Sequence, residues 1–391
     1  MSFNTPNRSL RPTLIINVGL VLLSTILTFV FLEGACWIWT KYYRTNHLPQ
    51  WEFRATQPAP YQGANYFSAK FLKESEESIR GRLFDVLELE DYEGKYFNVR
   101  KGYRVTTNLP DKSMGRILLF GGSTLFGQEV PDEFTVASHL QRLINRAGLG
   151  WEVLNFGLHG MNAKQQTKIL MRQAVNTNDI VIFYHGVNDV YYVIFGGYVD
   201  GWRMGVPGFR PIQKLNPIHK FFLSWHKRLK DYSFSADVAL DIYDRGQPNT
   251  VTDKHLLKAT LGLAARDFSK TIEEAALHVE KKVGRFVHFL QPQIFEVREL
   301  SNYEKSLVAN PLLIPPGLGI AFKQGYPRFR EVADDLRETG IQYYDISGVF
   351  NERVSNSEVL LDFCHVNHYG NELIAKGIFS SYRAELFKNQ E

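Results

Sequence analysis

The amino-acid sequence predicts an α/β fold with a central parallel β-sheet covered by helices on both faces, preceded by one N-terminal transmembrane helix. Beyond Met114, short apolar runs alternate with amphipathic stretches of helical spacing, a pattern typical of strand–helix–strand units. Residues 13–39 are almost continuously apolar, and about 20 such residues span a bilayer. A hydrophobic content of 44%, with 28 Phe and 19 Tyr, indicates a substantial core and argues against a disordered chain.

The apolar segment 13–39 follows a short tail, residues 1–12, and contains one charged residue, Glu33. We expect an uncleaved membrane anchor, with an interfacial belt of aromatic residues at its far end formed by Trp37, Trp39, Tyr42 and Tyr43. A cleaved signal peptide is the alternative, but its apolar region is about 7–15 residues long and precedes small residues, whereas this stretch is longer and bulkier. Glu33 also makes the string Leu32–Cys36 a poor lipoprotein signal.

Basic residues flank this segment on both sides, so the flanking charge does not set the orientation of the anchor. The short tail and the large C-terminal body favour a body outside the cytoplasm, which in a Gram-negative cell is the periplasmic side of the inner membrane. Residues 40–111 carry mixed charge, prolines and scattered aromatics, and we expect a linker and a membrane-proximal lead-in there. Within this region, the charged stretch Lys73–Arg82 predicts a solvated helix.

Residues 112–391 are predicted to form the main domain, with an insertion at about 191–257. The apolar runs in it predict strands at Arg116–Phe120, Glu152–Asn155, Asp179–Tyr184, Arg285–Leu290 and Gln342–Ile346. The amphipathic stretches predict helices at Val130–Asn145, Ala163–Val175, Thr260–Val283, Tyr326–Thr339 and Tyr369–Phe387. Because such sheets place their sites beyond the carboxyl ends of the strands, the residues that follow each strand are the first candidates for a site.

Polar residues follow the predicted strands at these ends. The candidate site residues at these ends are Ser123 after the glycines Gly121 and Gly122, Gly157 after the second strand, Asn188 after the third, and Asp362 with His365 in a loop after the last. Two glycines before Ser123 suit a tight turn that presents a hydroxyl above the edge of the sheet. No Gly-Lys-Ser/Thr sequence follows them, which argues against a phosphate-binding P-loop.

These residue types suit acyl transfer. A serine hydroxyl needs a base to take its proton, which His365 can do near neutral pH, and Asp362 can orient that histidine. The Ser123 N–H, the Gly157 N–H and the Asn188 side-chain amide are the expected donors to an oxyanion. Taken singly, each residue has a structural explanation as a helix cap, a turn residue or a satisfied loop histidine. Taken together, their positions at successive strand ends favour a site, with His368 as a competing base.

Composition argues against several other kinds of function and site. The formal net charge is +4 and no dense Lys/Arg block occurs, so nucleic-acid binding has little support. The two cysteines, Cys36 and Cys364, lie in the apolar segment and near the C-terminus, so a disulfide between them is not expected. No Cys/His spacing typical of zinc is present. We expect neither a metal nor another cofactor, because hydroxyl, imidazole, carboxylate and amide groups suffice for the chemistry above.

The order Gly-Gly-Ser, Asn-Phe-Gly, Gly-Val-Asn-Asp and Asp-x-x-His resembles the SGNH (GDSL-like) hydrolase superfamily over about residues 112–388. The resemblance assigns Ser123, Gly157, Asn188, Asp362 and His365 to the family's functional positions. It implies a flavodoxin-like three-layer α/β/α sandwich and the hydrolysis or transfer of ester-linked acyl groups. One departure is Gly122, which stands where the family usually has an aspartate. Asn367 and Gly370 are similar to the family's common ending, and the spacing favours His365 over His368.

The sequence therefore predicts a membrane-anchored serine esterase that acts on an O-acyl group, in the first place O-acetyl, of a glycan or on a lipid ester. Transfer of the acyl group to a sugar hydroxyl instead of water is a close variant. The second class is a non-enzymatic SGNH-like scaffold that binds a glycan or a partner in surface-polymer assembly. For the insertion 191–257, rich in aromatic and basic residues, a lid, a membrane-surface face and a packed subdomain all remain open.

Overall fold

A computed structural model describes residues 11–38, 59–79, 81–83, 87–194, 254–310, 313–314, 317–354 and 357–387. The chain divides into two units, residues 1–53 with 212–248, and residues 54–211 with 249–391. In the first unit the described element is helix α1 (Arg11–Ile38). Its stretch Ile16–Ala35 is long and apolar enough to cross a membrane, a property that a signal sequence shares, and it packs into no core. The rings of the expected aromatic belt lie outside the described residues.

The second unit is built on an eight-stranded sheet in the order β10-β9-β8-β6-β7-β5-β4-β3. Its parallel part consists of β6 (Gly115–Gly121), β7 (Trp151–Gly157), β8 (Ile180–His185), β9 (Arg285–Leu290) and β10 (Gln342–Asp345). Taken in chain order, these strands lie in the order 2-1-3-4-5, which is the flavodoxin-like arrangement. The predicted parallel sheet is confirmed, with each strand within two residues of its expected bounds.

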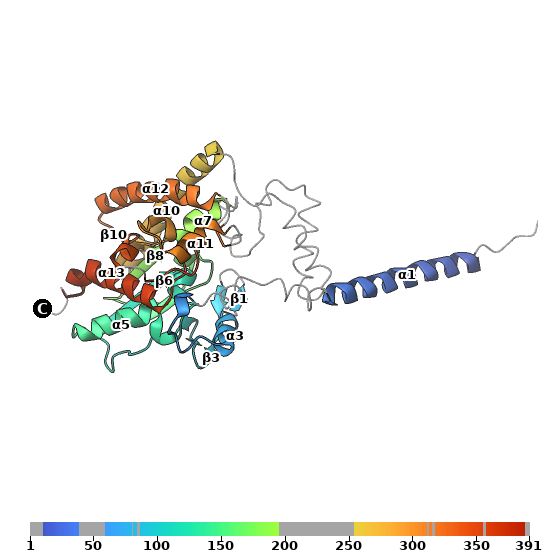
Figure 1. The fold of residues 1–391 in the computed structure, drawn as a ribbon, viewed down its shortest axis with the longest axis horizontal. Helices are drawn as coiled ribbons and strands as arrows, with labels where there is room; N and C mark the ends of the chain where they lie inside the picture. The colour runs from blue at the N-terminus through green and yellow to red at the C-terminus, as the bar shows by residue number, and fades with distance from the viewer. Residues whose placement is uncertain are drawn as a thin grey trace, which may run out of the picture. The chain divides into compact units, whose positions relative to one another are not determined.

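Helices cover both faces of this sheet, so the fold is a three-layer α/β/α sandwich (Figure 1). On one side α10 (Lys254–Glu280) contacts α6 (Ala163–Leu170), α7 (Val187–Ile194) and α12 (Leu318–Glu338). On the other side α5 (Val136–Arg146) packs against α13 (His368–Phe387). The core between the layers is aromatic and aliphatic, and the ring of Phe120 stacks on that of Phe156 with centroids 4.9 Å apart.

Several helices differ from their expected bounds for identifiable reasons. The helix expected from Val130 begins at Val136, because Pro131 starts a short 3-10 turn, Asp132–Phe134, and Thr135 then caps α5 by accepting a hydrogen bond from the Ser138 N–H. Helix α12 begins at Leu318 and runs through Pro327, whereas the sequence predicts a start at Tyr326. The described residues also include two short helices, α4 (Ser123–Phe126) and α11 (Asn302–Ala309). Separate 3-10 turns lie at Ala59–Tyr61, Ile294–Glu296 and Val349–Glu352.

The lead-in differs most from its sequence-based prediction. Strands β3 (Tyr92–Glu93), β4 (Asn98–Arg100) and β5 (Tyr103–Arg104) extend the central sheet, and β5 pairs antiparallel with β7. A separate hairpin joins β1 (Gly81–Leu83) to β2 (Leu87–Leu89). The helix expected at Lys73–Arg82 is α3 (Ala69–Glu77), and it is not wholly solvated because it buries Phe71. These strands were missed because two- and three-residue runs carry no readable period.

Candidate active site

Ser123 lies where the flavodoxin-like strand order reverses. It is the first residue of α4, directly after β6, and β6 lies between β7 and β8. Ligands of open α/β sheets bind at the carboxyl ends of strands at such a reversal. The turn before it requires glycine, since a Cβ on Gly122 would lie 2.7 Å from the Asn188 side-chain nitrogen and 3.3 Å from the Met161 carbonyl oxygen. A larger residue at position 122 would therefore have to displace the Asn188 amide.

The structure brings Ser123, His365 and Asp362 into one hydrogen-bonded row, although Ser123 and His365 are 242 residues apart in the chain. The Ser123 Oγ lies 2.7 Å from His365 Nε2. On the other side of the ring, His365 Nδ1 lies 2.7 Å from Asp362 Oδ2. The Asp362 side chain is 1% exposed and that of His365 is 12% exposed, so the carboxylate is buried and the histidine is nearly so. This is the arrangement of a nucleophile, a general base and an orienting carboxylate.

Backbone hydrogen bonds fold the Asp362–His365 loop back on itself. The second carboxylate oxygen, Asp362 Oδ1, accepts from the N–H of Cys364 at 2.9 Å and of His365 at 2.8 Å. The Leu361 N–H donates to the His365 carbonyl at 2.8 Å. The carboxylate therefore has one oxygen bonded to the backbone of the loop and the other bonded to the imidazole, which orients the ring.

Several contacts hold this loop over the edge of the sheet. The Ile294 N–H, beyond β9, donates to the Phe363 carbonyl at 2.9 Å. The Asn367 side chain donates to the Pro60 carbonyl in the lead-in at 2.9 Å and to the Glu358 carbonyl at 2.8 Å. The Phe363 ring also stacks on Tyr191 of α7, with centroids 5.2 Å apart and planes 2° from parallel. The loop is thus clamped from both flanks of the site.

The electrostatics of the imidazole follow from its carboxylate partner. Burial alone lowers the pKa of His365, but the negative charge of Asp362 and the hydrogen bond to it outweigh that effect, and the pKa is raised well above its usual value. The competing candidate, His368, is the first residue of α13 and packs near the Phe134 ring, and burial lowers its pKa. Of the two histidines, the structure places His365 beside the serine.

The three groups expected as oxyanion donors differ in the hydrogen bonds that they make in the structure. The Ser123 N–H begins a helix and has no intrahelical acceptor. The Asn188 amide lies against Gly122, and one of its hydrogens is donated to the Met161 carbonyl at 2.8 Å, which leaves the other for a ligand. The Gly157 N–H, by contrast, donates to Asn155 Oδ1 at 2.9 Å.

Gly157 has a packing role that the sequence did not reveal. A Cβ at this position would lie 2.3 Å from the Phe126 backbone nitrogen, so glycine lets β7 approach α4. Asn155 assists by donating to the Leu125 carbonyl at 2.9 Å. Three residues on, Gly160 has φ +68° and a carbonyl that accepts a hydrogen bond from the Tyr192 hydroxyl. Among the described residues its N–H has no acceptor, and it precedes Met161, which contacts Asn188.

Cys364 lies in the same loop, between Asp362 and His365. Its thiol is buried, lies 3.6 Å from His365 Nδ1, and has a pKa raised by burial to about 11, so it remains protonated. Ligand atoms of Asp362, Cys364 and His365 lie within 4.8 Å of one another, a spacing that a metal ion could use. Both imidazole nitrogens already have partners in the row described above, and this accounts for the cluster without a metal.

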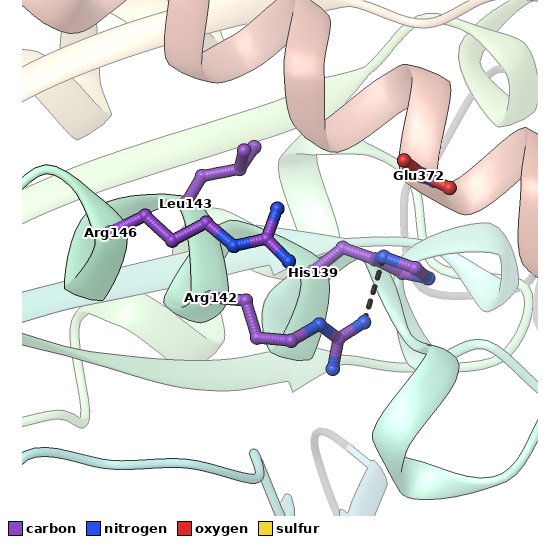
Figure 2. A pocket seen from close by; sticks show the side chains of 5 residues that line it. All are labelled: His139, Arg142, Leu143, Arg146 and Glu372. Carbon is purple, nitrogen blue, oxygen red and sulfur yellow. Dashed lines mark hydrogen bonds between the residues drawn. The ribbon is translucent and has the colours of Figure 1, made fainter.

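A separate cavity lies between α5 and α13, lined by His139, Arg142, Leu143, Arg146 and Glu372 (Figure 2). Arg142 donates to His139 Nδ1 at 2.8 Å and to the Glu133 carbonyl at 2.7 Å. Glu372, on α13, is paired with Lys376 at 2.7 Å. The lining charges are mixed and already partnered in part, and none of these residues belongs to the serine–histidine–aspartate row.

No family model matches the sequence, and no curated protein matches it. Solved structures with a similar arrangement include a G-D-S-L family lipolytic protein from Veillonella parvula, with 13% identity, 69% of this chain and 98% of that chain covered, and a TM-score of 0.39. An acetyl xylan esterase from Geobacillus stearothermophilus has 13% identity, coverages of 68% and 94%, and a TM-score of 0.39. A putative acylhydrolase from Bacteroides fragilis has 9% identity, coverages of 71% and 92%, and a TM-score of 0.37.

Proposed function

We propose that this chain is an SGNH-type serine hydrolase that cleaves carboxylic esters. The observation that supports the proposal is the pair of 2.7 Å contacts that link Ser123 Oγ to His365 Nε2 and His365 Nδ1 to Asp362 Oδ2. A buried serine–imidazole–carboxylate row at the carboxyl edge of a parallel sheet is built for proton transfer from the hydroxyl. A scaffold that only binds a ligand has no need of this geometry.

In the proposed reaction, the Nδ1–H of His365 donates to Asp362, so that Nε2 accepts the proton of Ser123 as the hydroxyl attacks the ester carbonyl. The tetrahedral oxyanion forms against the Ser123 N–H and the second Asn188 amide hydrogen. Collapse of this intermediate releases the alcohol, which takes the proton from His365 and leaves an acyl group on Ser123. Water, deprotonated by the same nitrogen, then attacks the acyl group, and the acid is released as His365 returns the proton to Ser123 Oγ.

We assign the third oxyanion donor to the Gly160 N–H in place of Gly157. The Gly157 N–H is engaged with Asn155, whereas that of Gly160 has no acceptor among the described residues. The hydrogen bond from Asn188 to Met161 ties this loop to the asparagine that faces the oxyanion. Three donors from three neighbouring strand ends would then meet above Ser123.

We propose an O-acyl group, in the first place O-acetyl, on a glycan or a lipid ester as the substrate. Helix α1 would act as an uncleaved anchor and hold the enzyme at the membrane, with the body outside the cytoplasm. A sugar hydroxyl that reached the acyl-enzyme before water would turn hydrolysis into O-acyl transfer by the same residues.

The test is intact-mass analysis of the full-length protein in detergent after reaction with a fluorophosphonate probe, together with hydrolysis of a chromogenic acetyl ester. Wild type is expected to gain one adduct on Ser123 and to release acetate. Ser123→Ala and His365→Ala should lose both signals, while His368→Ala, the competing histidine, should keep them. A folded wild type that neither labels nor hydrolyses the ester would overturn the proposal in favour of a glycan-binding scaffold.

A further inference from the structure

Gln291 lies directly after β9 and is 3% exposed. Its backbone is fixed on both sides, because its N–H donates to the His185 carbonyl at 3.0 Å and its carbonyl accepts from the Tyr326 hydroxyl at 2.9 Å. Both backbone groups of Gln291 are thus hydrogen-bonded, which fixes the position from which its side chain extends.

The side-chain amide of Gln291 bridges the two turns that carry the proposed chemistry. Its Nε2 donates to Thr124 Oγ1 at 2.8 Å, and Thr124 follows the nucleophile Ser123 in α4. Its Oε1 accepts from the Val187 N–H at 3.2 Å, and Val187 precedes Asn188 in α7. One amide therefore joins the turn after β6 to the turn after β8.

We propose that Gln291 is a positioning residue that sets the separation between the Ser123 nucleophile and the Asn188 oxyanion donor; this inference rests on the proposed function. The two turns belong to neighbouring strands, but β6 and β8 end before the turns, so the ladder between the strands does not fix them. An amide has both a donor and an acceptor, which is what a hydroxyl on one turn and an N–H on the other require. Preorganised donors lose their effect when displaced by about 1 Å, which can cost about 100-fold in rate.

Gln141 provides a matched control at the opposite end of the sheet. It is fully buried, its Nε2 donates to the Trp151 carbonyl at 2.9 Å, and its Oε1 accepts from the Val153 N–H at 2.8 Å. It thus makes the same kind of two-sided amide bridge near the start of β7, away from Ser123. Methionine is similar in size to glutamine, and at either position it removes a buried amide. A general loss of stability would therefore affect both variants.

The experiment compares Gln291→Met and Gln141→Met in the full-length protein, with steady-state ester hydrolysis and the rate of fluorophosphonate labelling at Ser123. We expect Gln291→Met to lower kcat and the labelling rate about 10- to 100-fold with KM within about threefold of wild type. Gln141→Met should lower the thermal midpoint while its kcat stays within about twofold of wild type. Equal effects of the two substitutions on kcat would reduce Gln291 to a structural residue and overturn the inference.

Substitutions at Thr124 test whether Gln291 acts through its hydrogen bond to the Thr124 hydroxyl. Thr124→Val removes the hydroxyl that accepts from Gln291, whereas Thr124→Ser keeps it, so serine should retain the activity that valine loses. The double variant Thr124→Val/Gln291→Met should be little slower than Gln291→Met alone, because both substitutions break the same bridge. Fully multiplicative losses would contradict the inference. A wild type that never labels at Ser123 would instead overturn the proposed function, and the positioning role would fall with it.

Discussion

Arg104 of β5 donates from Nε to Asp132 Oδ1 at 2.9 Å, and so joins the lead-in to the segment that follows the nucleophile turn. The same guanidinium donates to the Phe126 carbonyl at 2.8 Å and to the Val130 carbonyl at 2.7 Å, and it also contacts the Gly127 carbonyl. The Arg104 side chain is 0% exposed. The lead-in is therefore part of the body that carries Ser123.

Removal of this guanidinium should destabilise the whole body. We expect Arg104→Met to lower the free energy of unfolding by about 3–5 kcal/mol, because it leaves the Asp132 carboxylate buried without its partner. Denaturant unfolding measures this difference. Arg100→Met on the neighbouring strand β4, where the side chain is exposed, is the control and should change little. Equal stabilities of the two variants would show that the ion pair does not hold the lead-in.

The pH dependence of activity should reflect the carboxylate beside His365. The base works only when neutral, and Asp362 raises its pKa, so the acidic limb of kcat/KM should have its midpoint above 6.5, the ordinary value for histidine. Asp362→Asn should move this midpoint to lower pH and lower kcat by up to about 10⁴-fold through the wrong tautomer. A pH–rate profile of both proteins measures the shift. An unchanged midpoint of the acidic limb in Asp362→Asn would argue against the pairing of Asp362 with His365 in solution.

Loss of the Asn188 amide should affect catalysis more than binding. We expect Asn188→Ala to lower kcat about 10²–10³-fold, as removal of one oxyanion donor does, with a smaller change in KM. Steady-state kinetics on an acetyl ester provide the comparison. Asn176→Ala, at an exposed position before the start of β8 and therefore away from the site, serves as the control. A parallel rise in KM with unchanged kcat would place Asn188 in ground-state binding instead.

Two core histidines should make the body sensitive to acid. Burial lowers the pKa of His185 to about 3, and burial with His185 nearby lowers the pKa of His288 well below its usual range. The unfolded chain then binds more protons than the folded one below about pH 6.5, so stability is fully present above that pH and is lost as the pH falls towards 3. His288→Phe should flatten the dependence of the thermal midpoint on pH between 6.5 and 4. His278→Phe, in α10, is the control, and an unchanged slope in His288→Phe would contradict the assignment.

The parallel strands were predictable because their side chains are buried on both faces, which gives continuous apolar runs between turn residues. β9 was predicted residue for residue, and the strand order places Ser123 and Asn188 at adjacent ends. The reach of α12 through Pro327 was not predictable, since packing of α12 against α10 overrides the low helix propensity of proline there.

Local sequence determined the candidate nucleophile, base and carboxylate, because each follows a strand or lies three residues from its partner. The spacing favoured His365 over His368, but only the tertiary structure places His365 beside Ser123, in a loop held by contacts with Ile294 and Pro60. It also decided that the Gly157 N–H is engaged by Asn155, a contact set by the close packing of β7 on α4. Residue type and spacing carry the chemistry of a site, but the partner of each hydrogen-bonding group depends on which segments the folded chain brings within about 3 Å.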